Sequence, residues 1–159
     1  MDKQLMFVDG SVNTIRNIGY GAYLSVSEHE LSIDSLKSRV QVKRFEDTSS
    51  TKLELQTLLW ALTEVCETNK KLVVYTDSQN IIGLPGRRSD LERTGYRSGK
   101  NKLLNNHELY RQFYDIVDML DPHLMKVPGH QPSGQRDVMG QLFSLVDRAS
   151  RQALRAAYV

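Results

Sequence analysis

The chain has little of several features that often indicate a protein's class. Among its 159 residues there is one cysteine, and the formal net charge is only +2. A single cysteine, Cys66, excludes an internal disulfide framework and a cysteine-rich zinc site. Its place in a helical pattern predicts burial as a small hydrophobe, so we expect a reducing compartment. A charge of +2 is too small to indicate nucleic-acid binding by itself, so such an indication must come from where the charges cluster.

Long apolar runs are also absent from the sequence. The N-terminal segment MDKQLMFVDG holds a short apolar run that ends in Asp9, too short for a signal peptide or a membrane span. No repeat or low-complexity tract interrupts the chain, and its hydrophobic content of 40% is typical of a globular protein. We therefore expect a soluble, cytoplasmic monomer without a membrane partner, built as one domain over residues 1–159.

The first half of the chain changes from a strand pattern to a helical one. Residues 4–10, 19–28 and 38–46 show apolar runs or alternation and predict three antiparallel strands. Residues 49–69 show a helical period, and Ser49, Ser50 or Thr51 can cap its start. The apolar segment KLVVYT, residues 71–76, then predicts a strand that is covered on both faces.

The second half continues the alternation. Asp77 and Ser78 are suited to cap a helix after the strand at 71–76, which implies a parallel crossover. Residues 84–102 are polar and interrupted by glycine and proline, which predicts a loop. A helix is expected at 107–120, a short strand from 123 with His130 in the turn beyond it, and a last amphipathic helix at about 137–158. The fold class predicted is α/β, with a mixed five-stranded sheet and helices on both faces.

Four carboxylates stand where such a fold places functional sites. Asp9 and Asp77 end strands, Glu54 lies early in the helix at 49–69, and Asp147 lies in the last helix. Open α/β sheets bind ligands at strand ends, so these groups can converge. Converging carboxylates repel one another unless a cation offsets them, and their hard oxygens favour Mg²⁺ or Mn²⁺.

Each carboxylate also has an ordinary explanation when taken alone. Asp9 could be a turn residue before a glycine, and Asp77 could simply cap the next helix. Glu54 could be a solvated helix residue, and Asp147 could form an exposed pair with Arg151, four residues later. The residues alone leave both interpretations open.

The ordered settings FVDGS, TKLELQTLLWAL, LVVYTDSQ and LVDRASR resemble those of the ribonuclease H type I family, over most of the chain. The resemblance implies that Asp9 bridges two metal ions, that Glu54 and Asp77 complete one site, and that Asp147 completes the other. Two Mg²⁺ ions, which Mn²⁺ can replace, would activate a water and stabilise the leaving oxygen of a phosphodiester. His130 resembles the family's loop histidine, implicated in proton handling or product departure, although a lone loop histidine is otherwise usually solvated.

The resemblance also implies a substrate, an RNA/DNA hybrid, and residues that contact it. Gln79 takes the place of a minor-groove contact, where the RNA 2′-hydroxyl distinguishes a hybrid from duplex DNA. A basic insertion at about 84–104 stands where the family has a substrate handle that grips phosphates, although a solvated loop is the alternative. Tyr96 takes the place of a family tryptophan there. The contacts expected are Ser11, Ser50, Thr51, Ser78, Gln79, Arg87, Arg88, Arg93, Tyr96, Arg97, Lys100 and Lys102.

Three departures from the family pattern affect these expectations. The segment VNTIRNIGYG replaces a Gly-Pro-rich turn after DGS, and Ser50-Thr51-Lys52 stands where the family commonly has asparagine before the helix glutamate. The segment between His130 and Asp147 is longer than usual and makes Asp137 a rival fourth carboxylate. We prefer Asp147, since Asp137 is suited to cap the last helix.

The function expected is endonucleolytic hydrolysis of the RNA strand of RNA/DNA hybrids, giving 3′-hydroxyl and 5′-phosphate ends. One alternative is another nuclease on the same fold, such as a DNA nuclease or resolvase, because one fold hosts several functions. The other alternative is a non-catalytic nucleic-acid-binding module, which would be expected to have lost at least one of the carboxylates.

Overall fold

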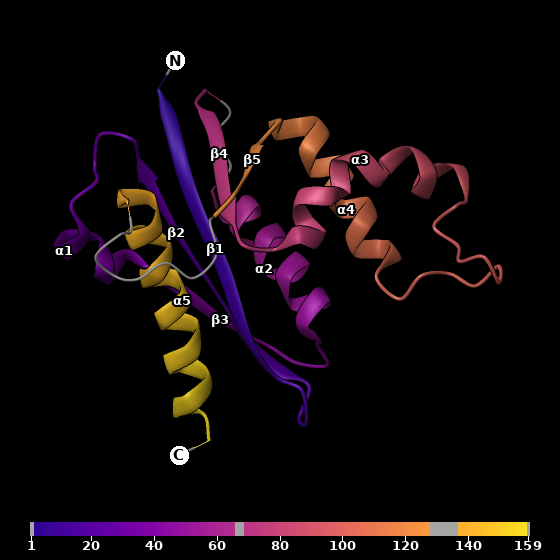
Figure 1. Cartoon of the computed structure of the whole chain (residues 1–159), viewed down its shortest axis with the longest axis horizontal. Coiled ribbons are helices and arrows are strands. Elements are labelled where there is room, and N and C mark those ends of the chain that lie inside the picture. The colour runs from indigo at the N-terminus through magenta and orange to yellow at the C-terminus, as the bar shows by residue number, and fades with distance from the viewer. Residues whose placement is uncertain (1, 66–68, 128–136, 159) are drawn as a thin grey trace.

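The computed structural model describes residues 2–65, 69–127 and 137–158. Five strands form one sheet in the order β3-β2-β1-β4-β5 (Figure 1). They are β1 (Lys3–Asn13), β2 (Ile18–Ser27), β3 (Gln41–Phe45), β4 (Lys71–Thr76) and β5 (His123–Lys126). The first three strands pair antiparallel, whereas β1 with β4 and β4 with β5 pair parallel. The predicted mixed sheet is therefore confirmed.

Helices cover both faces of this sheet, as predicted. Helix α5 (Val138–Ala156) lies on one face, near the short α1 (Ile33–Leu36), which a 3₁₀ turn (Lys37–Arg39) follows. Helices α2 (Ser50–Glu64), α3 (Gln79–Arg93) and α4 (His107–Leu120) lie on the other (Figure 1). No helix of the described ranges combines the length and the apolar character needed to cross a bilayer.

Strand β1 shows how one sequence supplies two cores. Leu5 and Phe7 join the apolar cluster beneath α5, whereas Met6 and Val8 join the cluster beneath α2. Successive side chains point to opposite faces of a strand, so a run that is apolar at every position is buried on both. Each such side chain contributes roughly 1.5–3 kcal/mol on burial, which fixes the register of the central strand.

Helix α3 corrects the loop predicted from residue 84 onward. It runs through Pro85 to Arg93, although a proline inside a helix removes one hydrogen bond and costs about 3 kcal/mol. Leu84 and Leu91 are buried in the same cluster as three aromatic residues of α4, and the Tyr114 hydroxyl donates to the Leu84 carbonyl (2.6 Å). Packing against α4 thus outweighs the local preference for a break.

Three further boundaries differ from the prediction. Strand β1 runs to Asn13 rather than ending near residue 10, because its last residues pair with β2, so Asp9 lies within the strand and not at its end. Helix α2 ends at Glu64 rather than near residue 69, because Val65 leaves the helical conformation (φ −114°, ψ 61°). Strand β3 begins at Gln41 rather than at residue 38, because residues 33–39 form the short helical turns around the buried Leu36. Cys66 lies outside the described residues, so its expected burial stays a prediction.

We call α3, residues 94–106 and α4 the α3–α4 arm. It extends away from the sheet, and its far end is the connection between the two helices (Figure 1). Within that connection Arg97 and Leu103 form an isolated antiparallel bridge, and Tyr96, Gly95 and Asn101 adopt positive φ. The predicted basic insertion is therefore half helix and half tight turns.

Candidate metal and nucleic-acid site

Strands β1 and β4 bring Asp9 and Asp77 to the same edge of the sheet. Phe7 of β1 and Tyr75 of β4 are paired in the parallel register. Asp9 lies two residues after Phe7, and Asp77 lies two residues after Tyr75. Because side chains alternate along a strand, Asp9 shares the α5 face of β1 with Phe7, whereas Asp77 directly follows the last residue of β4. Asp9 is half-buried and lines a small pocket together with Glu54 and Asp77.

Helix α2 supplies Glu54 from the opposite face. The Ser49 hydroxyl accepts from the Lys52 amide and caps the helix start, so Glu54 lies in its second turn. Gly10, which follows Asp9, allows close approach, since a Cβ there would lie 2.9 Å from Leu53 Cδ2. A methyl group at Gly21 of β2 would overlap the Thr57 hydroxyl. The glycines thus let α2 bring Glu54 near the sheet edge.

Helix α5 supplies Asp147, whose carboxyl lies within hydrogen-bonding reach of the Asp9 carboxyl. Arg151 Nε donates to Asp147 Oδ1 at 3.0 Å, so the ordinary i,i+4 pair also forms. The Ser150 hydroxyl donates to the Asp147 carbonyl (3.0 Å) and lies 3.1 Å from the Ser11 hydroxyl of β1. The pairing with Arg151 and the approach to Asp9 therefore coexist.

The electrostatics of these carboxylates indicate crowding of like charge. Burial first, then the hydrogen bond to Asp147 and the charge of Asp77, raise the pKa of Asp9 to about 8. Burial raises the pKa of Glu54, and the charge of Asp77 adds to this effect. Burial and the charge of Asp147 raise the pKa of Asp77. A bound cation would relieve this repulsion.

Two cations next to the site were not among the residues predicted for it. Lys126, the last residue of β5, and Arg151 both lower the pKa of Asp77, in opposition to its burial. Sequence patterns marked Arg151 only as a helix pair and gave no reason to select Lys126. The sequence signal that could have indicated Lys126 is its position as a charged residue at the end of a short strand.

Ser78 connects the carboxylates to the start of α3. Its hydroxyl donates to Glu54 Oε2 at 2.6 Å and accepts from the Ile81 amide at 3.2 Å, so one side chain caps α3 and orients Glu54. The expected helix cap at this point is therefore confirmed. Because Ser78 is buried, its hydroxyl contacts Glu54 and is not presented at the molecular surface.

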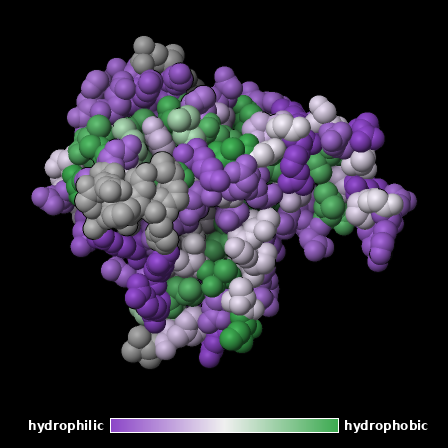
Figure 2. Space-filling view, viewed as in Figure 1, coloured by the Kyte–Doolittle hydropathy of each residue, from purple (hydrophilic) through white to green (hydrophobic). Residues whose placement is uncertain are grey.

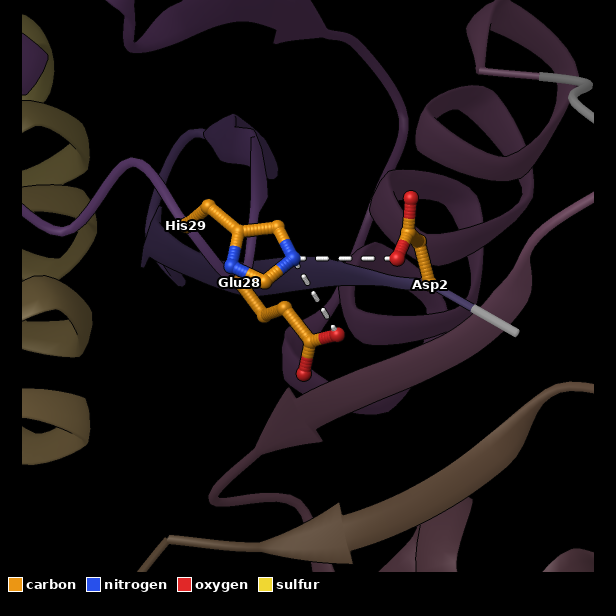
Figure 3. Close-up of side chains that lie close together, drawn as sticks. All are labelled: Asp2, Glu28 and His29. Carbon is orange, nitrogen blue, oxygen red and sulfur yellow. Dashed lines mark ion pairs between the residues drawn. The ribbon is translucent and has the colours of Figure 1, made fainter.

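The donor set fits hard divalent cations. Carboxylate oxygens are the ligands that Mg²⁺ and Mn²⁺ prefer, and the excess negative charge at Asp9, Glu54, Asp77 and Asp147 has only partial compensation from the protein. Among the described residues, the tightest group of possible ligands lies elsewhere. It comprises Asp2, Glu28 and His29 (Figure 3).

The cluster of Figure 3 does not compete with the four carboxylates. His29 Nε2 lies 3.7 Å from an oxygen of Asp2 and 3.7 Å from one of Glu28, which an exposed ion pair explains. Asp2 lies seven residues before Asp9, about 23 Å along an extended strand. Asp2 precedes the start of β1, whereas Asp9 lies in its second half, so the two groups are well separated.

Asp137, the rival fourth carboxylate, stands at the start of α5. The Asp137 carboxylate accepts from the Gly140 amide at 2.8 Å and caps α5, as expected. The α5 carboxylate that raises the pKa of both Asp9 and Asp77 is that of Asp147. His130 lies outside the described residues, so its role stays a prediction.

The nucleic-acid residues predicted near the carboxylates fall into two groups. Gln79, Ser50 and Thr51 are exposed at the starts of α3 and α2. Ser11 is half-buried against Ser150, and Ser78 is buried. The first group is accessible to a ligand at the surface, whereas the hydroxyls of the second already have protein partners.

The basic residues of the α3–α4 arm differ in whether they bind other residues of the protein. Arg88 makes a bidentate contact with Asp118 (2.6 and 2.7 Å) and a third bond to Glu92 (2.7 Å), so it ties α3 to α4. Lys100 and Lys102 are exposed near the far end, where Figure 2 shows mostly hydrophilic surface. The arm thus contains both internal ties and cations presented to solvent.

Three other predicted contacts of the arm have partners of their own. Arg87 donates to Asn80 Oδ1 (3.1 Å), Arg93 pairs with Asp90 (3.3 Å), and Arg97 donates to the Asn101 carbonyl (3.0 Å). All three arginines remain exposed. Tyr96 is buried beneath the Arg111 guanidinium, 4.6 Å from the ring centroid, and so packs within the arm.

Comparison with known proteins gives two relatives by sequence. The chain is 26% identical over 120 residues to a ribonuclease H of Syntrophomonas wolfei, covering 74% of this chain and 75% of that protein. It is 25% identical over 130 residues to a ribonuclease H of Novosphingobium aromaticivorans, covering 79% and 82%.

Solved structures share the fold at low sequence identity. The solution structure of the PFV RNase H domain superposes with a TM-score of 0.73 at 15% identity, covering 95% of this chain and 93% of that one. The foamy viral protease-reverse transcriptase in complex with an RNA/DNA hybrid gives 0.68 at 11% identity, covering 95% and 19%. The model of the RNase H family matches residues 1–154, and the chain therefore belongs to the ribonuclease H family.

Proposed function

We propose that the protein is an endoribonuclease that hydrolyses the RNA strand of RNA/DNA hybrids in a metal-dependent reaction. The observation that carries the proposal is the convergence of Asp9, Glu54, Asp77 and Asp147 from two strands and two helices in a chain of the ribonuclease H family. A non-catalytic module has no need for four converging carboxylates, of which Asp9, Glu54 and Asp77 have pKa values raised by burial and by neighbouring negative charge.

Asp9, Glu54, Asp77 and Asp147 would together hold two Mg²⁺ ions. When bound, the ions supply a water of lowered pKa and positive charge next to the leaving oxygen, so that 3′-hydroxyl and 5′-phosphate ends result. The protein contributes the geometry. Ser78 fixes the rotation of Glu54, and Arg151 fixes that of Asp147. No protein nucleophile is required.

The surface around these residues would hold the duplex. Gln79 would contact the minor groove, and the exposed cations of the α3–α4 arm would contact phosphates, which give affinity without sequence information. Ser11, Ser50 and Thr51 would be further contacts to the duplex, and His130 would assist proton transfer or product departure. The fold shared with a polymerase solved on an RNA/DNA hybrid supports this substrate.

The experiment that tests the proposal compares end-labelled RNA/DNA hybrid, duplex DNA and duplex RNA, each with Mg²⁺ or with EDTA. We expect cleavage of the hybrid alone, in its RNA strand and only with metal. Asp77→Asn keeps the size of the side chain but removes a ligand charge, and it should abolish cleavage while the fold is retained. Cleavage of the hybrid in EDTA would contradict the metal mechanism, and cleavage of duplex DNA would favour a DNA nuclease.

A further inference from the structure

Lys126 joins the end of β5 to the start of α3. Its Nζ donates to Gln79 Oε1 at 2.8 Å. Strands β4 and β5 make the contact possible because they end in register, with Thr76 opposite Lys126 and the Val127 amide donating to the Thr76 carbonyl (2.8 Å). Gln79 follows Thr76 by three residues and is the first residue of α3.

The chemistry of this contact determines which end of the Gln79 amide faces outward. A lysine ammonium carries only donors, so it can bind the carbonyl oxygen of an amide and not its nitrogen. With Oε1 directed at Lys126, the two N–H groups of Gln79 remain for other partners. Both residues are exposed, so these N–H groups can reach a ligand at the surface.

An amide held in this way presents donors where a nucleic acid offers acceptors. The minor groove displays adenine N3 and the pyrimidine O2 atoms, and an RNA strand adds the 2′-hydroxyl oxygens. Lys126 is also close enough to Asp77 to lower the pKa of that carboxyl. The amide and the carboxylates therefore share one cationic neighbour.

We propose that Lys126 is a positioning residue for substrate recognition, which holds the Gln79 amide so that its N–H groups donate to minor-groove acceptors of the duplex. The inference rests on the proposed function and adds to it a residue outside the predicted site. Lys126 acts through Gln79, so its effect disappears when Gln79 is absent.

A double-mutant cycle on hybrid cleavage tests this dependence. Lys126→Met removes the ammonium and keeps most of the apolar stem. It should raise KM for the hybrid about three- to tenfold and change kcat little, because an effect of this size corresponds to the loss of one oriented hydrogen bond. Gln79→Ala should raise KM by at least as much. In the Gln79→Ala background, Lys126→Met should have no further effect, because residues that act as a unit are not additive.

Two substitutions sharpen the cycle. Lys126→Arg keeps a donor for Gln79 Oε1 and should restore most of the affinity. Gln79→Glu can still pair with Lys126 but presents no N–H group, so its KM should be as high as that of Gln79→Ala. Thermal melts of all variants check that the fold is kept.

Lys100→Met is the matched control, because Lys100 is an exposed lysine of the arm proposed to contact phosphate. Its effect should add to that of Gln79→Ala and should reduce the salt dependence of binding by about one phosphate contact. The same additive behaviour for Lys126→Met would overturn the inference and make Lys126 a phosphate contact. An unchanged KM in Lys126→Met would also overturn it. Wild-type protein that leaves the hybrid intact would instead remove the proposed function itself.

Discussion

The carboxylate site and the α3–α4 arm are both rich in charged residues, but the fold holds them differently. The carboxylates stand on β1, α2 and α5 and directly after β4, where burial and neighbouring negative charge raise the pKa values of Asp9, Glu54 and Asp77. The arm carries exposed ion pairs such as Arg93 with Asp90. Charges that are half-buried respond strongly to one another, whereas water and salt screen exposed charges. Chemistry is therefore expected from the first region and affinity from the second.

The largest expected effect concerns the fourth carboxylate. Asp147→Asn should lower hybrid cleavage by at least about a hundredfold, because a lost metal ligand removes several kcal/mol of transition-state stabilisation. Asp137→Asn is the matched control, since asparagine also caps helices and the Gly140 contact can persist. Steady-state rates on labelled hybrid measure both. If Asp137→Asn were the more damaged variant, the fourth ligand would be Asp137.

The second largest effect is expected in how the stability of the protein depends on pH, through the carboxylate site. The pKa of Asp9 is raised to about 8 from 3.8, so between these values the folded protein keeps a proton that the unfolded chain releases. Without metal, stability should fall as pH rises through this window and level off above it. Thermal melts in EDTA from pH 4 to 9 measure the trend.

Controls for this trend come from one variant and one ligand. Asp9→Asn should flatten it, since the variant cannot ionise, and Mg²⁺ should restore stability at pH 8 because it binds the folded state. A melting temperature of metal-free protein that rises steadily to pH 8 would contradict the crowding of Asp9, Asp77 and Asp147.

Two glycines, one in each region, test how closely the backbone is packed. Gly21→Ala should lower the free energy of unfolding by about 1–3 kcal/mol, because the new methyl group overlaps Thr57 and pushes α2 from the sheet. Gly86→Ala in α3 meets open space among the described residues, and should stabilise the helix by roughly 0.5–1 kcal/mol. Urea unfolding measures both. Equal effects would show that the two regions are packed alike.

The smallest expected effect on chemistry comes from the arm. Replacing Arg87, Arg93 and Arg97 with alanine should weaken hybrid binding and flatten its salt dependence by up to about 0.9 in slope for each lost phosphate contact. The rate at saturating hybrid should change little. Arg88 is left in place because it ties α3 to Asp118. A salt slope equal to that of the wild type would show that these arginines are ordinary solvated residues.

The sequence predicted the sheet well because its strands carry strong local patterns. The two-face apolar run of β1 and the continuous run of β4 each indicated a central strand. Asp77 follows the end of β4 as expected, but β1 continues past Asp9 to Asn13 because those residues pair with β2. The helix through Pro85 could not be predicted, because burial of Leu84 and Leu91 against α4 outweighs the local signal. Tertiary packing of this kind is invisible to periodicity.

Side-chain partners were the least predictable part of the candidate site. Lys126 and Gln79 are 47 residues apart, and their contact depends on the register of β4 with β5 rather than on any motif. Arg88 and Tyr96 were expected to contact the nucleic acid. In the structure Arg88 binds Asp118, and Tyr96 packs beneath Arg111. Composition located the basic segment without showing which cations face solvent.

The Ser78 hydroxyl has a consequence for regulation of the proposed reaction. One oxygen atom both caps α3, the first helix of the arm, and donates to Glu54, so any displacement of α3 by a bound duplex would also disturb the orientation of the Glu54 carboxylate. The proposed affinities for metal and for nucleic acid would then be thermodynamically linked, and the linkage would be reciprocal. Whichever sign this coupling has, a duplex that changes metal affinity by a given factor would have its own affinity changed by the same factor when metal binds.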